Sequence, residues 1–126
     1  MNYRFITKDL HAFLDYPVAA SLMLLPILLN LGDSHPLAMW LSIATGVAAF
    51  GLTLLTDHWA GVLRIVPYSV HVAVDAAVGI VFLAAPFIFG FNGLDATYYL
   101  VNGAAVMTVV SLHKPSALVE TQPATV

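Results

Sequence analysis

The chain is short and strongly apolar. It has 126 residues, of which 60% are hydrophobic and 9% are charged, and its formal net charge is −3. Soluble domains average about 45–50% apolar and about 25% charged residues, and a fold of this size could not bury so much apolar side chain. We therefore expect an integral membrane protein. With four basic residues in all, the chain has no basic patch for nucleic acid, so nucleic acid is excluded as a partner.

Four apolar runs follow one another along the chain. They cover residues 10–31, 37–56, 70–91 and 97–112. The first three have about the 20 residues that cross a hydrocarbon core, and the fourth is at the short limit. Unbroken apolar runs are typical of membrane helices and not of barrel strands. The predicted fold class is therefore all-α, an integral membrane four-helix bundle with the lipid bilayer as its solvent.

The segments between and beyond these runs are polar or mixed. Residues 1–9 form the N-terminal segment, and residues 59–69 form a connection with Trp59 and Tyr68 at its two ends, as is typical of the membrane interface. Residues 114–126 are rich in Pro and Thr and are predicted to be a disordered tail. The first apolar run has no small-residue cleavage site, so we expect it to be retained.

The basic residues predict the orientation. With four crossings, Arg4, Lys8, Arg64 and Lys114 all fall on one side of the membrane, and the two loops on the other side contain no Lys or Arg. The positive-inside rule therefore places both termini and the middle connection in the cytoplasm. The predicted location is the inner (plasma) membrane, with several crossings.

The second half of the chain repeats features of the first. An offset of sixty residues aligns His11 with His71, Asp15 with Asp75, and Pro26 with Pro86. In each half the second apolar run is followed by a histidine, His58 or His113. Each half is predicted to be a helical hairpin, residues 10–58 and 70–113, and two crossings per half make the repeats parallel.

The stretch "LTDHWAGVLRIVPYSVHVAVDAAVGIVFLAAPFIFGF", together with "LHAFLDYPVAASLMLLP", resembles the SPW-repeat family of small bacterial integral membrane proteins. The resemblance covers most of residues 8–113. The family takes its name from a Ser-Pro-Trp in each hairpin, and this chain has Leu25-Pro26-Ile27 and Ala85-Pro86-Phe87 at those places, so only the prolines match. The resemblance implies a bacterial membrane protein of this fold and no established activity.

The topology predicts a polar cluster at the cytoplasmic mouth of the bundle. His11 and His71 begin helices that leave that side, and each precedes an aspartate by four residues, which places the pair on one helix face. Carboxylates inside an apolar span normally face the bundle interior. The candidate site residues are His11, Asp15, His58, His71, Asp75 and His113, with Asp57 and Arg64 in a supporting role.

Two interpretations of this cluster stay open. In the first, the residues are boundary or hydrogen-bonding groups, because acidic residues in first turns and histidines in last turns suit the helix dipole. In the second, they hold a cofactor. Imidazoles and carboxylates without thiolates suit zinc, iron, manganese or copper, and two facing histidines suit haem b.

The sequence leaves three functional hypotheses. The first is a small non-enzymatic membrane protein, an accessory subunit of a larger membrane complex or a homo-oligomer. The second is a metal- or haem-dependent membrane oxidoreductase or hydrolase that uses the cluster. The third is a small oligomeric proton or ion transporter, in which Pro26 and Pro86 break their helices near mid-span.

Overall fold

The computed structural model describes residues 4–113 and contains four α-helices, which are α1 (Lys8–Leu28), α2 (Leu37–Leu55), α3 (Tyr68–Phe89) and α4 (Gly93–Ser111). Within this range the chain forms no strands, only two isolated bridges. The all-helical prediction is confirmed. The predicted disordered tail, residues 114–126, lies outside the described residues.

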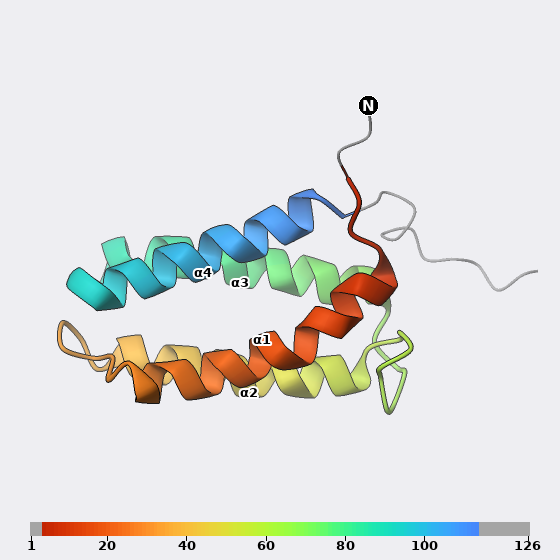
Figure 1. Ribbon diagram of the computed structural model, residues 1–126, viewed down its shortest axis with the longest axis horizontal. Coiled ribbons are helices and arrows are strands. Elements are labelled where there is room, and N and C mark those ends of the chain that lie inside the picture. Colours follow the sequence, from red (N-terminus) through yellow and green to blue (C-terminus); the bar gives the residue numbers. More distant parts are fainter. Residues whose placement is uncertain (1–3, 114–126) are drawn as a thin grey trace, which may run out of the picture.

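The helices form two antiparallel hairpins, α1 with α2 and α3 with α4, that lie side by side (Figure 1). At one end, which we call the site end, α1 and α3 begin and α2 and α4 finish. At the other, the loop end, lie the connections 29–36 and 90–92. Helices α1, α2 and α3 are long and apolar enough to cross a membrane, whereas α4 is less apolar.

Three helices begin earlier than their apolar runs, α1 and α3 by two residues and α4 by four. The Oγ1 atom of Thr7 accepts a hydrogen bond of 3.1 Å from the backbone N–H of Leu10, so α1 begins at Lys8. Asn92 has an extended backbone directly before α4, which begins at Gly93 and not at residue 97. The first turn of each of these three helices contains polar residues, and the apolar stretch follows it.

Pro26 and Pro86 lie in the last turns of α1 and α3, and a third helical proline, Pro17, lies near the middle of α1. The breaks expected near mid-span at Pro26 and Pro86 are therefore wrong. After α1, Asn30 adopts a left-handed conformation with φ of 52°, and the N–H of Leu31 bonds the carbonyl of Pro26 at 2.9 Å. Gly90 ends α3 with φ of 71°. Pro26 and Pro86 therefore help to end these helices near the loop end.

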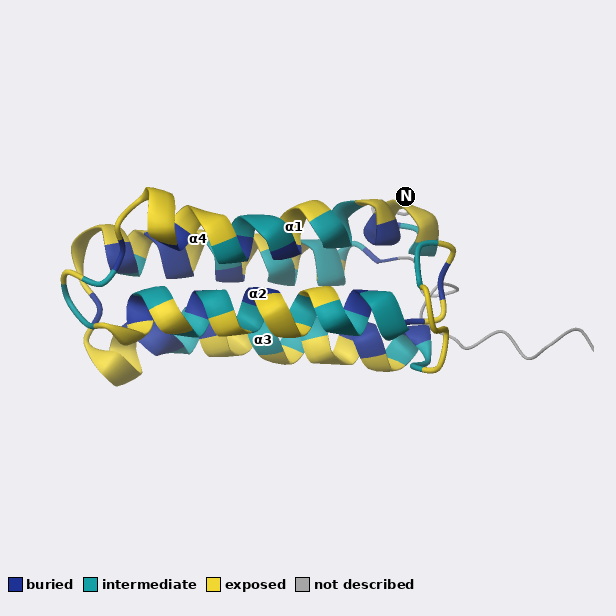
Figure 2. Ribbon diagram, turned by 90° about the horizontal axis from the view of Figure 1, so that it is seen from below, coloured by how far each residue is buried: buried dark blue, intermediate teal, exposed yellow. Residues whose placement is uncertain are grey.

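Within each hairpin the helices approach closely at glycine. A Cβ added at Gly46 of α2 would lie 2.9 Å from the carbonyl oxygen of Ala19 in α1. A Cβ added at Gly103 of α4 would lie 3.0 Å from the backbone N of Leu83 in α3. Buried positions accordingly face the partner helix and the bundle interior, and exposed positions cover the outside (Figure 2).

A buried carboxylate joins the two hairpins at the loop end. Asp95 is 2% exposed and accepts hydrogen bonds from the N–H groups of Gly32 and Ser34, each at 2.9 Å, and from the Ser34 hydroxyl. The Tyr99 hydroxyl donates to the carbonyl of Ala38 at 2.8 Å. The apolar core lies at the same end and contains Leu22, Leu31, Ala38, Phe82, Ala85, Phe91, Tyr98 and Tyr99.

We predict that Gly46→Ala destabilises the fold by about 1–3 kcal/mol, because the added methyl group meets the α1 backbone and forces the helices apart. The measurement is thermal unfolding in mild detergent, followed by circular dichroism. Gly51→Ala on the same helix is the control, because nothing lies within 4 Å of its added Cβ. Equal stability of the two variants would contradict the close packing of α1 on α2.

Candidate metal centre

The chain topology gathers four histidines at the site end. His11 lies in the first turn of α1 and His71 in the first turn of α3, while His58 and His113 directly follow the ends of α2 and α4. All four are buried, with exposed fractions of 4% or less. The fifth histidine, His35, is at the loop end, where its Nδ1 accepts a hydrogen bond from a backbone N–H.

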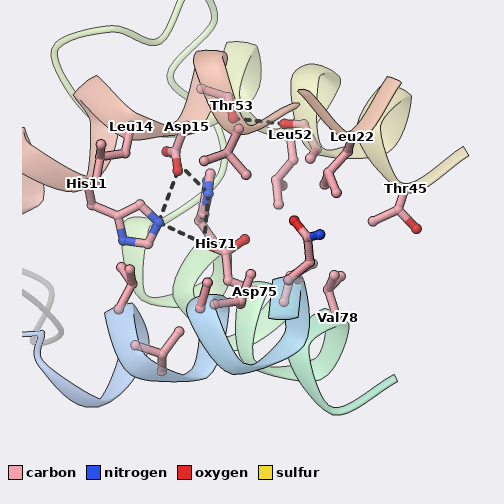
Figure 3. Close-up of a pocket in the computed structure, with 18 of the residues that line it drawn as sticks. His11, Leu14, Asp15, Leu22, Thr45, Leu52, Thr53, His71, Asp75 and Val78 are labelled. Carbon is pink, nitrogen blue, oxygen red and sulfur yellow. Dashed lines mark hydrogen bonds and ion pairs between the residues drawn. The ribbon is translucent and has the colours of Figure 1, made fainter. Parts of the chain in front are cut away.

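Two carboxylates lie between the imidazoles of α1 and α3 (Figure 3). The Nε2 atom of His11 is 3.0 Å from Oδ1 of Asp15 and 2.8 Å from Oδ2 of Asp75. The Nε2 atom of His71 is 3.4 Å from Oδ2 of Asp15 and 3.3 Å from Oδ2 of Asp75. Each imidazole therefore contacts the carboxylate of its own helix and that of the other hairpin.

The second nitrogen of each imidazole is held by the end of a helix from the opposite hairpin. Nδ1 of His11 is 2.8 Å from Nε2 of His113, and Nδ1 of His71 is 2.6 Å from Oγ1 of Thr56. The hydroxyl of Tyr68 is 2.5 Å from the same nitrogen of His113. These contacts fix the rings with both Nε2 atoms directed at the carboxylates, as second-sphere partners orient metal-ligating histidines.

His58 lies beside this group without a hydrogen bond. Its side chain is 0% exposed, and its Nε2 atom is 3.5 Å from Oδ2 of Asp15. Within the described part of the chain, the two ring nitrogens of His58 and Oδ2 of Asp15 form no well-aligned hydrogen bond, although Nε2 of His71 also lies 3.4 Å from that oxygen. Burying a polar atom without such a bond costs about 1–3 kcal/mol, so a group that supplies one would stabilise the cluster.

Burial also determines the protonation of the two histidines that lie outside the helices. It lowers the pKa of His113 to about 4, and it lowers the pKa of His58 below its ordinary value. Both imidazoles are therefore neutral near pH 7. Neutral imidazole is the form that ligates metals and that accepts a hydrogen bond at one nitrogen.

The arrangement meets the donor requirements of a four-coordinate cation. His11, Asp15, His71 and Asp75 each offer one atom, and these atoms lie within 4.8 Å of one another. Ligands at 2.0–2.1 Å from a tetrahedral ion are separated by about 3.3 Å. The nitrogen–oxygen distances of 2.8, 3.0, 3.3 and 3.4 Å, which involve both oxygens of Asp15, are near that spacing. The set of four atoms extends to 4.8 Å, so side-chain shifts would bring it around one ion.

A haem fits this site less well. His11 and His71 are 5.6 Å apart between ring centroids and meet at 81°. Oδ2 of Asp75 is within 3.3 Å of both Nε2 atoms, so a carboxylate occupies the space between the two nitrogens that a porphyrin needs. The donor set favours a bare metal ion over a macrocycle.

The two residues predicted to support the site lie away from it. Asp57 is exposed, and Arg64 is exposed with its guanidinium donating to the carbonyls of Trp59 and Gly61 in its own loop. The structure instead adds Tyr68 and Thr56 to the cluster. Tyr68 precedes His71 by three residues on one helix face, which is a signal that the sequence contains. Thr56 carries no comparable signal, because its role depends on how α2 meets α3.

Comparison with known protein families, with curated proteins and with solved structures finds no match to this chain. The resemblance to the SPW-repeat family therefore stays a prediction. The function rests on the geometry of the site and on the composition of the helices.

We predict a coupling free energy of about 1–3 kcal/mol between His11 and Asp75, because their 2.8 Å contact joins the two hairpins in a buried site. A double-mutant cycle with His11→Ala and Asp75→Ala measures it from unfolding in detergent with a chelator present. A parallel cycle of His11→Ala with Asp95→Ala, at opposite ends of the bundle, should be additive. Additivity in both cycles would show that the contact across the hairpins is not formed.

Proposed function

We propose that this chain is an integral membrane protein in which all four helices cross the bilayer, with both termini and the connection 59–69 in the cytoplasm. Large apolar side chains on the outer faces support this placement. Phe87 is 80% exposed, Leu28 76%, Phe13 65% and Trp40 61%. A surface of this kind has lipid as its natural solvent, since monomeric soluble proteins rarely expose large contiguous apolar patches.

We also propose that the two hairpins are parallel repeats. Ile6 forms a bridge with His113 after α4, and Val66 forms a bridge with Thr56 after α2. Ile6 and Val66 are related by the same sixty-residue offset as the His and Asp pairs. In both halves the segment before the first helix thus pairs with the end of a second helix, which supports a common origin for the halves.

The function that the geometry supports best is binding of one divalent first-row transition metal ion between the hairpins. The observation that carries it is the convergence of four ligand atoms, one each from His11, Asp15, His71 and Asp75, between the hairpins. Oδ2 of Asp15 forms no well-aligned hydrogen bond there, although Nε2 atoms of His71 and His58 lie 3.4 and 3.5 Å from it. A cation at this point would be ligated by Asp15 and would neutralise two partly buried carboxylates.

Within that proposal the roles divide by distance. His11, Asp15, His71 and Asp75 would hold the ion, while His113 and Thr56 would orient the two imidazoles. A set of nitrogen and oxygen donors suits zinc, iron, manganese or Cu(II). The ion would act as a Lewis acid or a redox centre, and the accessory-subunit and transport hypotheses stay predictions.

We predict that cysteines placed at opposite ends of α2 react from opposite sides of the membrane. The chain has no natural cysteine, so single substitutions give clean labels. In intact spheroplasts a membrane-impermeant maleimide should label Asp33→Cys, and it should label Asp57→Cys only after permeabilisation. Both residues are exposed at their ends of the bundle.

The same labels at Asn92→Cys and Ser111→Cys test the crossing by α4, which is not among the three helices long and apolar enough to be candidate spans. Labelling of both members of a pair from outside would show that the helix between them does not span the membrane.

We predict that protein purified in mild detergent and incubated with zinc, manganese, iron or copper retains about one ion per chain of its preferred metal after desalting. His11→Ala/His71→Ala should abolish that retention. Thr56→Val should weaken metal affinity by about 10–100-fold, because it releases Nδ1 of His71. Elemental analysis measures retention, and titration with a competing chelator measures affinity.

His35→Ala is the matched control for the histidines, since its ring lies at the loop end. Thr53→Val is the control for Thr56→Val, because the Thr53 hydroxyl bonds the Ala49 carbonyl within its own helix. Wild-type protein that retains no metal, or a His11→Ala/His71→Ala variant that retains as much as wild type, would refute the metal site.

A further inference from the structure

A cavity of about 280 Å³ lies between the two hairpins and ends at the His/Asp cluster. Side chains from all four helices line it. Most of the helix packing is within each hairpin, and the polar ties between hairpins are at the two ends of the bundle. The cavity therefore lies along the interface between the hairpins, between its two ends, where side chains do not fill the space.

The cavity changes in polarity along its length. Its site end is formed by the four candidate ligands, and its walls are mainly aliphatic, including Leu14, Val18, Val78 and Val106. Three hydroxyl side chains also line the walls, and each donates to a backbone carbonyl of its own helix: Ser21, Thr45 and Thr53. Asn102 lines it further along α4, next to Gly103, which packs on Leu83 of α3. On α1 the lining runs from His11 to Leu22, eleven residues along the helix, so the cavity extends about 16 Å toward the middle of the bundle.

This gradient matches the profile of one lipid leaflet. The cluster lies in the first turns of α1 and α3, at the level where a membrane helix meets the headgroups, and the aliphatic part points toward mid-span. Ala48 and Ala105 are exposed and also line the cavity, so it opens to the outside of the bundle. A hydrocarbon chain could therefore enter from the bilayer.

The charges at the site end favour a neutral head group. Two carboxylates, Asp15 and Asp75, line that end, and none of the described lining residues is Lys or Arg. The basic groups of the wall at this end are the imidazoles of His11 and His71, and both already contact Asp15 and Asp75, so an anionic head would have to compete with these carboxylates for them. A hydroxyl or carbonyl could donate to a carboxylate or accept from an imidazole, with no charge to desolvate.

We propose that this cavity binds a neutral single-chain amphiphile, such as a long-chain alcohol, with its polar head against His11, Asp15, His71 and Asp75 and its chain along the aliphatic walls. The proposal rests on the membrane placement under the proposed function and names the class of molecule that reaches the cluster. It requires no metal, because head and chain are recognised by the protein's own side chains.

The test uses the full chain in lipid nanodiscs and a long-chain primary alcohol with a diazirine at the far end of its chain. After photolysis, mass spectrometry should find cross-links to lining residues of both hairpins. Ala49→Phe/Ala105→Phe fills the cavity and should reduce these cross-links by about tenfold, equivalent to about 1.4 kcal/mol of binding free energy. Ala44→Phe/Ala104→Phe is the control, since these two alanines are exposed on the same helices and do not line the cavity.

The fatty acid of the same chain length, with the same diazirine, should cross-link about tenfold less at pH 8. Equal labelling by the acid would overturn the neutral head. Cross-links confined to outward-facing residues, or unchanged by cavity filling, would overturn the binding site. Ala49→Leu/Ala105→Leu provides a milder filling variant if the phenylalanine variant does not fold.

Metal content of the same samples is measured separately, so the two proposals can fail independently. If the wild-type protein and its control variant His35→Ala contain no metal but their cavities are still labelled, the amphiphile site is supported independently of the metal site. Loss of labelling with metal still bound would overturn the amphiphile site alone.

Discussion

The structure depends on how two carboxylates are kept inside an apolar bundle. Asp15 and Asp75 are 9% and 21% exposed at the seam between hairpins, where an uncompensated charge costs several kcal/mol. His11 contacts both of them, at 3.0 and 2.8 Å, so one imidazole links α1 to α3. The ends of the other two helices complete this arrangement. α2 and α4 finish at this end, where Thr56 and His113 contact the Nδ1 atoms of His71 and His11.

The carboxylates at the two ends of the bundle are stabilised by different partners. At the loop end the Asp95 carboxylate is satisfied by backbone and hydroxyl donors from the other hairpin, and it is a structural tie. At the site end carboxylates meet imidazoles, and several buried atoms have no hydrogen-bond partner in the described chain. A buried polar group whose hydrogen bonds are all formed rigidifies a fold. A buried polar group whose hydrogen bonds are incomplete either binds a further group or destabilises the fold. The cavity between these ends joins the second kind of site to the apolar middle of the bundle.

The sequence predicted the helices well and the site in part. Long apolar runs leave little choice but helix, and the four-residue spacing within His11–Asp15 and His71–Asp75 placed each pair on one face. Asp57 and Arg64 are both exposed, because a loop can turn a charge outward at no cost, and a sequence pattern does not show which way a loop side chain turns. Thr56 could not be predicted, since its contact with His71 depends on the angle at which two hairpins meet. The breaks expected at Pro26 and Pro86 were misplaced because helix ends depend on turn geometry as much as on proline.

In the proposed metal centre both hairpins ligate one ion through two imidazoles and two carboxylates. X-ray absorption on zinc-loaded protein measures this ligand set. We expect nitrogen and oxygen neighbours at about 2.0–2.1 Å from the zinc, with scattering from two imidazoles. This spectrum should be lost in Asp15→Asn/Asp75→Asn and unchanged in His35→Ala. A zinc spectrum with no imidazole scattering, or one that the Asp15→Asn/Asp75→Asn variant leaves unchanged, would contradict this ligand set.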